Sequence, residues 1–448
     1  GGETVTSSVN IREIVLDILM EILERDGLSH QVLRQALSKY QYLDKAERSF
    51  ITRLSEGTVE YLPQIDHVLG ACSSVKVHKM KPVIRTILRM SVYQLLYMDR
   101  VPDAAVCNEA VKLAVRRKFA GLKGFVNGVL RTAARRKDEW VFEDGALACC
   151  LPQWLYDRCA SEYGSETVRR MAESFLESRR LSVRCNVSRA PKEEIIKSLR
   201  SQGVTVEESD LSPAVLYLRD YDYLERLDAF EEGLIQVQDV SSVLAGHAAA
   251  VESGDRVIDV CGAPGGKSLH VADLLKGTGH VEVRDISDYK VGLIEENIAR
   301  AGFQNMEARV WDALELDPAA VESADIVLAD LPCSGLGIIG RKPEIKYRVT
   351  PEQIKSLAKL QREILSVVWQ YVKPGGQLIY STCTISPEEN QNNVKWFLEN
   401  FPFEPTGLSG RLPETLDTGS FKEGWVQLLP GRYPGDGFFI AALRRNDG

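Results

Sequence analysis

Residues 257–268 read Val257-Ile258-Asp259-Val260-Cys261-Gly262-Ala263-Pro264-Gly265-Gly266-Lys267-Ser268, and an apolar pattern with helical spacing follows at 269–275. This order of strand, glycine turn and helix is typical of a doubly wound parallel sheet. Glycines let the backbone pass close to a ligand, and the first turn of the helix offers free N–H groups. A glycine turn can also serve merely to reverse the chain, and this one is neither a Walker loop nor the spaced dinucleotide fingerprint. It predicts an α/β domain with a candidate ligand loop.

Acidic residues follow the next two predicted strands. The strand at 281–283 leads to Asp285, at the distance downstream where an acid meets ribose hydroxyls in nucleotide-binding sheets. Asp312 follows the strand at 308–311 and is placed to accept a hydrogen bond from an adenine amino group. A lone aspartate is commonly a helix cap or a turn residue. A glycine loop and two acids at three successive strand ends are better explained by a nucleoside ligand.

Two cysteines follow two further predicted strands. The strand at 324–329 leads to Asp330 and Cys333, and the strand at 376–380 leads to Cys383. Because open parallel sheets bind ligands beyond the carboxyl ends of their strands, both thiols are expected at the ligand edge. Most cysteines in globular proteins are inert buried hydrophobes, and we interpret the other seven in this way.

The rest of the chain falls into regions of different pattern. Apolar residues with helical spacing begin at Ile11, with Asn10 as a candidate cap, and continue to about residue 140 with almost no strand pattern. Helical and strand-like segments then mix until about residue 232. Inside the α/β region, Thr350–Gln353 and Ser386–Glu389 both read as cap, Pro, acid and capping partner, which predicts a helix start at each.

Composition limits the class of protein. A chain of 448 residues exceeds the usual size of a single core, and 44% hydrophobic with 26% charged residues is ordinary for a globular protein. We expect a cytoplasmic protein, since there is no apolar run near the roughly 18 residues of a membrane span and no signal-peptide pattern. Nine cysteines without a secreted scaffold's spacing indicate reduced thiols. Without a C-x-x-C pair or paired histidines, we expect no metal.

Positive charge is concentrated near the start, although the net charge is −8. Residues 111–137 contain nine Lys or Arg and no acid, and residues 73–98 contain five more, again without an acid. An isolated basic run is often a solvated helix face. Two acid-free stretches in one domain of an acidic protein instead predict a surface that binds the phosphates of RNA or DNA.

Together these motifs resemble one family. The segments Cys261–Lys267, Asp330–Cys333 and Thr382–Cys383 resemble the C-x-A-P-G-G-K, D-x-P-C and T-C motifs of the RNA cytosine-5 methyltransferases of the Sun (RsmB-type) group. Further matches lie at 341–346, 388–390 and 435–439, so the resemblance spans the chain. It implies a multi-domain protein with three parts: an all-α NusB-like RNA-binding domain at 1–145, a small α+β RRM-like domain at 146–232, and an α/β Rossmann-like class I methyltransferase domain at 233–448.

The resemblance also implies an activity, the methylation of carbon 5 of a cytosine in 16S ribosomal RNA by a monomeric cytoplasmic enzyme that needs no membrane. It assigns the attack on the base to Cys383, product release to Cys333, and hydrogen bonding of the cytosine to Asp330. S-adenosylmethionine, with S-adenosylhomocysteine as product, is expected on the residues Cys261, Gly262, Ala263, Pro264, Gly265, Gly266, Lys267, Asp285, Asp312 and Asp330.

Chemistry explains why a cysteine is needed. Carbon 5 of cytosine is a poor nucleophile, so a thiolate must first add to carbon 6. A free thiol has a pKa of about 8.5, so Cys383 needs an electropositive pocket, to which Lys267 is a candidate contributor. Two alternatives stay open: a DNA cytosine-5 methyltransferase, in which the Pro-Cys cysteine is the nucleophile, and a non-catalytic RNA-binding or assembly factor.

Overall fold

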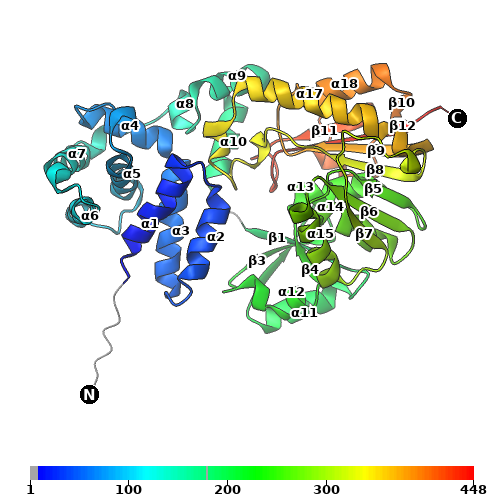
Figure 1. The fold of residues 1–448 in the computed structure, drawn as a ribbon, viewed down its shortest axis with the longest axis horizontal. Coiled ribbons are helices and arrows are strands. Elements are labelled where there is room, and N and C mark those ends of the chain that lie inside the picture. The colour runs from blue at the N-terminus through cyan, green and yellow to red at the C-terminus, as the bar shows by residue number, and fades with distance from the viewer. Residues whose placement is uncertain (1–8, 178–179, 448) are drawn as a thin grey trace. The chain divides into compact units, whose positions relative to one another are not determined.

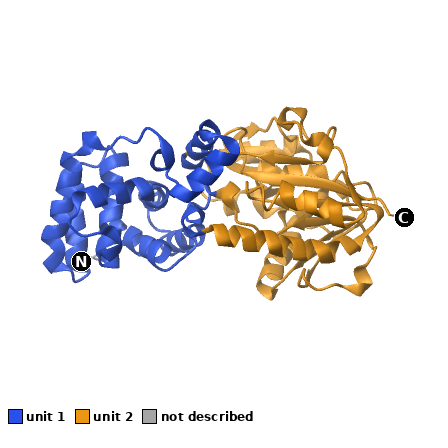
Figure 2. Ribbon diagram, turned by 90° about the horizontal axis from the view of Figure 1, so that it is seen from above, with its two compact units in different colours: residues 1–176, 339–348 blue, residues 177–338, 349–448 orange. Residues whose placement is uncertain are grey.

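The computed structural model describes residues 9–177 and 180–447 (Figure 1). The chain divides into two units, residues 1–176 with 339–348 and residues 177–338 with 349–448 (Figure 2). The first unit includes the helices up to Leu176, and the predicted domain boundaries after residues 145 and 232 stay predictions. No helix in the described part of the chain combines the length and the apolar character that a membrane crossing requires.

The first unit is all-helical. Asn10 caps its first helix as predicted, by accepting the Glu13 N–H at 3.0 Å. Buried apolar side chains from α1 to α7 form one core. The helices are α1 (Ile11–Leu19), which continues into the π-helical turn η1 (Met20–Glu24), α2 (Ser29–Lys39), α3 (Lys45–Glu60), α4 (Leu62–Cys72), α5 (Pro82–Tyr97), α6 (Asp103–Arg116), α7 (Lys123–Arg135), α8 (Gly145–Ala148), α9 (Gln153–Tyr163) and α10 (Ser165–Leu176).

A short segment from much later in the sequence completes this unit. Residues 339–348, which include α16 (Ile345–Arg348), belong to it (Figure 2). The buried Glu344 carboxylate accepts the N–H of Ser29 at 3.0 Å and its hydroxyl at 2.6 Å. Ser29 is the first residue of α2, and its N-cap Leu28 has no side chain that could cap the helix. Glu344 therefore caps α2 from a distance of 315 residues.

Cationic side chains of the same segment reach helix ends. Lys346 Nζ donates to the carbonyl of Glu60, the last residue of α3, at 2.7 Å. Arg348 donates to the carbonyls of Ile22 and Gly27 at 2.8 Å each. Burial lowers the pKa of Lys346 to about 8. An anion at a helix start and a cation at a helix end both oppose the helix dipole, so the segment matches the electrostatics of the helices it contacts.

The second unit begins with a four-stranded antiparallel sheet in the order β2-β3-β1-β4. One face of this sheet packs on α11 through Val183 and Leu216. The other face carries Val215 and Tyr217, which share a hydrophobic cluster with α13. This face is therefore not an open platform for RNA bases, as the sheet of an RRM is. The elements are β1 (Leu181–Cys185), α11 (Lys192–Ser201), β2 (Thr205–Glu208), β3 (Val215–Arg219), α12 (Asp228–Glu231) and β4 (Ile235–Val237).

The remainder of the unit is a Rossmann-like sheet in the order β10-β12-β9-β8-β5-β6-β7, with β11 paired to β12. Strands β5 to β9 are parallel, and β12 is antiparallel to β9. The strands are β5 (Arg256–Asp259), β6 (His280–Asp285), β7 (Met306–Val310), β8 (Ala324–Asp330), β9 (Val372–Thr382), β10 (Phe403–Pro405), β11 (Trp425–Leu428) and β12 (Phe438–Arg445).

Helices cover both faces of this sheet. Helices α13 (Val240–Ala248), α14 (Gly266–Leu275) and α15 (Asp288–Ala301) pack on one face, and α17 (Pro351–Val368) and α18 (Gln391–Asn400) pack on the other. The predicted helix start at Thr350 is confirmed, with a complete capping box to Gln353. The one predicted at Ser386 is wrong, because residues 387–390 form a turn and α18 begins at Gln391. The Glu389 side chain is buried instead of capping a helix.

Replacing Glu344 by alanine should destabilise the first unit. The change removes the cap of α2 and leaves two buried Ser29 donors without an acceptor, which costs about 1–3 kcal/mol. Amide hydrogen exchange should show faster exchange across Ser29–Lys39. The control is Glu162→Ala, which removes an exposed carboxylate from α9 and should change exchange little. Equal protection of α2 in Glu344→Ala and the parent would contradict the capping role.

Candidate active site

The glycine loop connects β5 to α14 and is fixed by close contacts. A Cβ on Gly262 would lie 2.2 Å from the Val283 side chain, so no larger residue fits there. Gly265 has a φ of 110° and directly precedes α14. The N–H of Ala263 donates to the Asp285 carboxylate at 2.9 Å. The loop is thereby held beside the end of β6, where its backbone can line a ligand site.

Asp259, the last residue of β5, supports this loop from beneath. Its carboxylate accepts the Ser268 hydroxyl at 2.6 Å and the Cys261 N–H at 3.3 Å. Burial raises the pKa of Asp259 to about 7; the Ser268 hydrogen bond and Lys267 oppose this rise, and the charge of Asp330 adds to it. The sequence predicted Asp259 as a strand residue and gave it no role in the site. An acid inside an apolar run could have indicated such a role.

The two predicted acids lie at neighbouring strand ends. Asp285 ends β6, and its carboxylate also accepts the N–H of Ile286 at 2.7 Å. The N–H of Trp311 donates to the Asp285 carbonyl at 2.9 Å, which places Asp312 beside the end of β6. Asp312 accepts the N–H of Leu314 at 2.9 Å. The loop and both acids are therefore at one edge, as predicted from their positions in the sequence.

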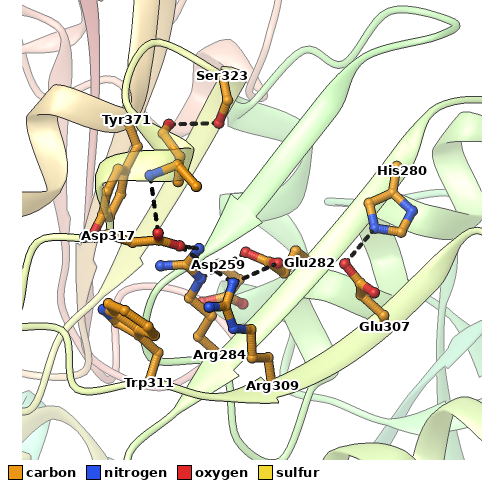
Figure 3. A network of polar contacts seen from close by, with 12 residues as sticks. Asp259, His280, Glu282, Arg284, Glu307, Arg309, Trp311, Asp317, Ser323 and Tyr371 are labelled. Atoms are coloured by element: carbon orange, nitrogen blue, oxygen red, sulfur yellow. Dashed lines mark hydrogen bonds and ion pairs between the residues drawn. The ribbon is translucent and has the colours of Figure 1, made fainter.

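A buried ionic network lies next to these acids (Figure 3). Arg284 donates to Glu282 at 2.7 Å and to Asp317 at 2.6 Å, and Arg309 donates to the same Asp317 oxygen at 3.3 Å. This ionic network joins β6 and β7 to the chain segment between β7 and β8, which carries Asp312. Sequence reasoning missed this network. Its signal was the alternation of Glu282 and Arg284 with apolar residues, which puts both charges on one face of a strand.

Lys267 and Asp330 form an ion pair between the glycine loop and the end of β8. Lys267 Nζ lies 2.6 Å from Asp330 Oδ2, and the Ser381 hydroxyl donates to the other oxygen of Asp330 at 3.2 Å. Burial lowers the pKa of Lys267, but the charge and hydrogen bond of Asp330, with the charges of Asp259 and Cys383, outweigh it, so the pKa is raised overall. Because the charge of Cys383 is among the causes that raise this pKa, Lys267 is a candidate to stabilise a thiolate at Cys383.

The two predicted thiols meet. Cys333 Sγ and Cys383 Sγ are 3.3 Å apart. The hydrogen bond to Cys383 raises the pKa of Cys333 well above the ordinary value, and burial and the negative charges of Cys383, Glu389 and Asp330 add to this rise. Either thiol can be the donor in this contact, and the shift disfavours a thiolate at Cys333. Burial raises the pKa of each of the other seven thiols.

Two glycines allow two backbone segments to pack closely beside Cys383. The N–H of Gly337 donates to the Cys383 carbonyl at 3.0 Å. A Cβ on Gly337 would lie 2.1 Å from the carbonyl oxygen of Gly437, so the two glycine backbones touch. Gly437 belongs to segment 435–439 near the end of the sequence. This segment resembles the family's pattern, but the sequence predicted no role for it. Phe438 places its ring 5.0 Å from Lys267 Nζ.

The basic stretches of the first unit are less uniform than the sequence implied. Arg85 and Arg89 pair with Glu24 and Asp66 and are largely buried, so residues 73–98 do not present these charges to a ligand. In the stretch 111–137, Arg117 pairs with Glu13 and Asp17, and Arg136 pairs with Glu139. The exposed cations of that stretch are Lys112, Arg116, Lys118, Lys123, Arg131, Arg135 and Lys137.

Among the described residues, no group of three or more His, Cys, Asp or Glu side chains is placed to hold a metal ion. A Rossmann-like sheet with a glycine loop, two acids and two thiols at the carboxyl ends of its strands is the architecture of a class I methyltransferase.

Comparisons with known proteins identify the family. The profile described as "16S rRNA methyltransferase RsmB/F" matches residues 247–444, "NusB family" matches residues 9–135, and "Methyltr_RsmF/B-like, ferredoxin-like domain" matches residues 151–222. The "Probable ribosomal RNA small subunit methyltransferase B" of Bacillus subtilis (strain 168) is 34% identical over 446 residues, which are 97% of this chain and 99% of that protein. The "Ribosomal RNA small subunit methyltransferase B" of Cronobacter sakazakii is 31% identical over 439 residues, with 97% and 99% covered.

A solved structure has a similar fold over nearly the whole chain. The crystal structure of PH0851 superimposes with a TM-score of 0.82 at 28% identity, covering 97% of this chain and 99% of that one. The chain belongs to the RsmB/F family of ribosomal RNA small subunit methyltransferases, which depend on S-adenosylmethionine. The predicted fold, with NusB-like, small ferredoxin-like and Rossmann-like parts, is confirmed.

Replacing Lys267 by methionine should slow alkylation of Cys383. Without the cation, the thiolate fraction at neutral pH falls, and iodoacetamide reacts only with the thiolate. We expect a rate at least ~10-fold lower at pH 7.5, equivalent to a one-unit rise in the pKa of the thiol. Mass spectrometry of the Cys383 peptide measures it. Lys267→Arg, which keeps the charge, is the control, and equal rates for all three proteins would mean that Lys267 has no influence on this thiol.

Proposed function

We propose that this protein methylates carbon 5 of one specific cytosine in 16S ribosomal RNA through a covalent adduct with Cys383. The observation that carries the proposal is the 3.3 Å contact between Cys333 and Cys383, beside the ion pair of Lys267 and Asp330. A methyltransferase acting on a nucleophilic oxygen or nitrogen has no need for two thiols at its ligand edge. Carbon 5 of cytosine does need a thiol, because only addition at carbon 6 makes it nucleophilic.

The proposed cofactor site is the glycine loop with its neighbouring acids. S-adenosylmethionine supplies an electrophilic methyl group on a sulfonium. The backbone of Cys261, Gly262, Ala263, Pro264, Gly265, Gly266 and Lys267 would line it, Asp285 would accept the ribose hydroxyls, and Asp312 would accept the adenine amino group. One feature fits such a ligand: the paired strands β6 and β7 end side by side, and the two acids follow these ends. Asp330 contacts Lys267 of this loop and lies three residues before Cys333.

The proposed reaction uses the thiols in turn. The Cys383 thiolate forms a bond to carbon 6, and the electron pair of the 5,6 double bond moves toward carbon 5. Carbon 5 would then take the methyl group as its bond to the sulfonium sulfur breaks, which would leave S-adenosylhomocysteine. A base then removes the proton from carbon 5, the double bond re-forms, and the bond between carbon 6 and sulfur breaks to return the thiolate. Cys333 would assist this elimination. Asp330 would hydrogen-bond nitrogen 3 and the amino group of the cytosine and so stabilise the adduct.

The RNA is expected to bind the first unit through α7. This helix exposes Lys123, Arg131 and Arg135. Gly124 and Gly128 lie on the same helix, and a Cβ on either would meet nothing within 4 Å. Neither the packing nor the backbone of the unit explains these helix glycines, but a flat basic face would let a phosphate backbone approach closely. As the sequence implied, we expect the enzyme to act as a cytoplasmic monomer.

The two cysteines should fail in different ways when replaced. Cys383→Ala cannot bond to carbon 6, so it should be inactive and give no covalent complex. Cys333→Ala should still add to the base and transfer the methyl group, then stay attached to the RNA. Denaturing electrophoresis with 16S ribosomal RNA and S-adenosylmethionine should show a protein–RNA band for Cys333→Ala alone.

Other outcomes have distinct meanings. A band for Cys383→Ala and none for Cys333→Ala would transfer the attack to the Pro-Cys position and favour the DNA-type mechanism. Activity that survives both changes would make the thiols structural. No methylation of RNA cytosine by the parent protein would leave the non-catalytic binding or assembly role.

Reversing the exposed charges of α7 should weaken RNA binding without changing the chemistry. For the triple variant Lys123→Glu, Arg131→Glu and Arg135→Glu, the Michaelis constant for RNA should rise at least ~10-fold. The slope of log affinity against log salt should fall by about 0.7–0.9 for each phosphate that the variant no longer neutralises. Arg169→Glu with Arg170→Glu, on the exposed face of α10, is the matched control. An unchanged salt slope in the triple variant would show that α7 is only a solvated face.

A further inference from the structure

We propose that two adjacent buried residues, Glu389 and Asn390, are positioning residues with separate tasks. Glu389 fixes the Cys333 loop (residues 332–334), and Asn390 fixes the Cys383 loop (residues 382–384). Both lie in the turn before α18, where the sequence predicted a helix start instead. The inference rests on the proposed cysteine mechanism and assigns a separate support to each of its two steps.

Glu389 holds the Cys333 loop through Ser334, the next residue. One carboxylate oxygen accepts the Ser334 N–H at 2.9 Å, and the other accepts the Ser334 hydroxyl at 2.6 Å. Gln361 of α17 donates to Glu389 at 3.1 Å and to the Pro332 carbonyl at 2.9 Å, so the residues on both sides of Cys333 are fixed. Glu389 and Gln361 are both fully buried. A buried carboxylate is costly without such partners, and here they are Ser334 beside Cys333 and Gln361 of α17.

Asn390 holds the Cys383 loop through the residues on both sides of the thiol. Its side-chain oxygen accepts the Thr382 hydroxyl at 2.6 Å, and its amide donates to the Thr384 carbonyl at 3.0 Å. The same amide reaches Gln427 of β11 at 2.7 Å. Asn390 is fully buried as well. These contacts straddle Cys383 and reach neither Cys333 nor its neighbours.

Contacts beside that of the two sulfurs also join the loops. The hydroxyls of Ser334 and Thr384 lie 2.7 Å apart, and the N–H of Gly337 donates to the Cys383 carbonyl at 3.0 Å. The pairing of β8 with β9 ends at Asp330 and Ser381, and the pairing of β12 with β9 ends at Thr382. The chain beyond β8 is irregular, so the separation of the sulfurs depends on the hydrogen bonds of the turn before α18.

The two supports should therefore serve different steps. Displacing the Cys333 loop leaves Cys383 able to add to the base but disturbs elimination, so methylated adduct should accumulate. Displacing the Cys383 loop should prevent the addition itself. A positional error of about 1 Å in a catalytic group can cost roughly 100-fold in rate, so each effect should be large.

The test compares ordinary RNA with RNA that carries 5-fluorocytidine at the target position. Fluorine at carbon 5 cannot leave as a cation, so this RNA is trapped after addition and methyl transfer, and its rate reports those steps alone. Glu389→Ala should trap within about 3-fold of the parent but turn over ordinary RNA roughly 100-fold more slowly, with visible adduct. Asn390→Ala should trap roughly 100-fold more slowly and accumulate no adduct on ordinary RNA.

Milder variants and controls separate positioning from misfolding. The amide of Glu389→Gln can still accept the Ser334 N–H and donate to the Ser334 hydroxyl, so turnover should recover to within about 5-fold of the parent. Ser334→Ala should share the defect of Glu389→Ala, and Thr382→Val that of Asn390→Ala, without removing a buried group of the turn. Glu399→Ala, which removes an exposed carboxylate from α18, should behave as the parent. Unchanged affinity for S-adenosylhomocysteine by calorimetry shows that the cofactor site is intact.

The outcomes distinguish this inference from the proposed function. Failure of the parent protein to trap 5-fluorocytidine RNA would overturn the proposed covalent mechanism and this inference with it. A second result is normal trapping by the parent while Ser334→Ala and Thr382→Val each lose trapping and turnover to the same extent. That result would overturn only the assignment of separate steps to Glu389 and Asn390. Parent-like turnover in Glu389→Ala and Asn390→Ala would overturn the positioning role of both residues.

Discussion

The parallel pairing of β8 with β9 is the constraint on which the site depends. Asp330 lies opposite Ser381 in this pairing, so the chain segments that follow both strands leave the sheet at the same edge. Two thiols that are 50 residues apart in sequence can therefore meet at 3.3 Å. The pairing of β5 with β8 adds the glycine loop to this edge, and Lys267 reaches Asp330 across it. A shift of one residue in either register would turn the strand-end side chains to the opposite face and separate these groups.

Charged groups inside the second unit serve geometry more than stability. Arg284 with Glu282 and Asp317 is nearly inaccessible to solvent, and so is Arg184 of β1, which lies 3.8 Å from Asp273 of α14. Buried ion pairs contribute little net stability, because the desolvation of the charges offsets their attraction. They do restrict the arrangement, since a shifted strand would leave a charge unpaired. The first pair steadies the connection that carries Asp312, and the second joins the antiparallel sheet to the Rossmann-like sheet.

The sequence was sufficient for features that depend on local pattern and one general rule. Strand, glycine turn and helix could be read directly, and the rule that parallel strands end at one edge placed Asp285, Asp312, Cys333 and Cys383 together. Features set by contacts between distant segments could not be read. The motif at Ser386 has the composition of a helix start, yet burial of Glu389 against Ser334 makes it a turn. Arg85 looked like a surface charge because its partner Glu24 lies 61 residues away. Similarly, nothing in residues 339–348 indicates that they pack among helices near the start of the chain.

That discontinuous unit has a consequence for synthesis on the ribosome. The helices up to Leu176 emerge well before residues 339–348, which supply the cap of α2 and the cations at the ends of other helices. About 160 residues, 177–338, must be translated in between, which takes roughly 10–30 s at about 5–20 residues per second. During this interval the nascent helical bundle exposes uncapped helix ends and the apolar surface that Tyr347 later covers. The first part of the chain to be made is therefore among the last to be finished, and exposed apolar surface of this kind favours aggregation until the segment is translated.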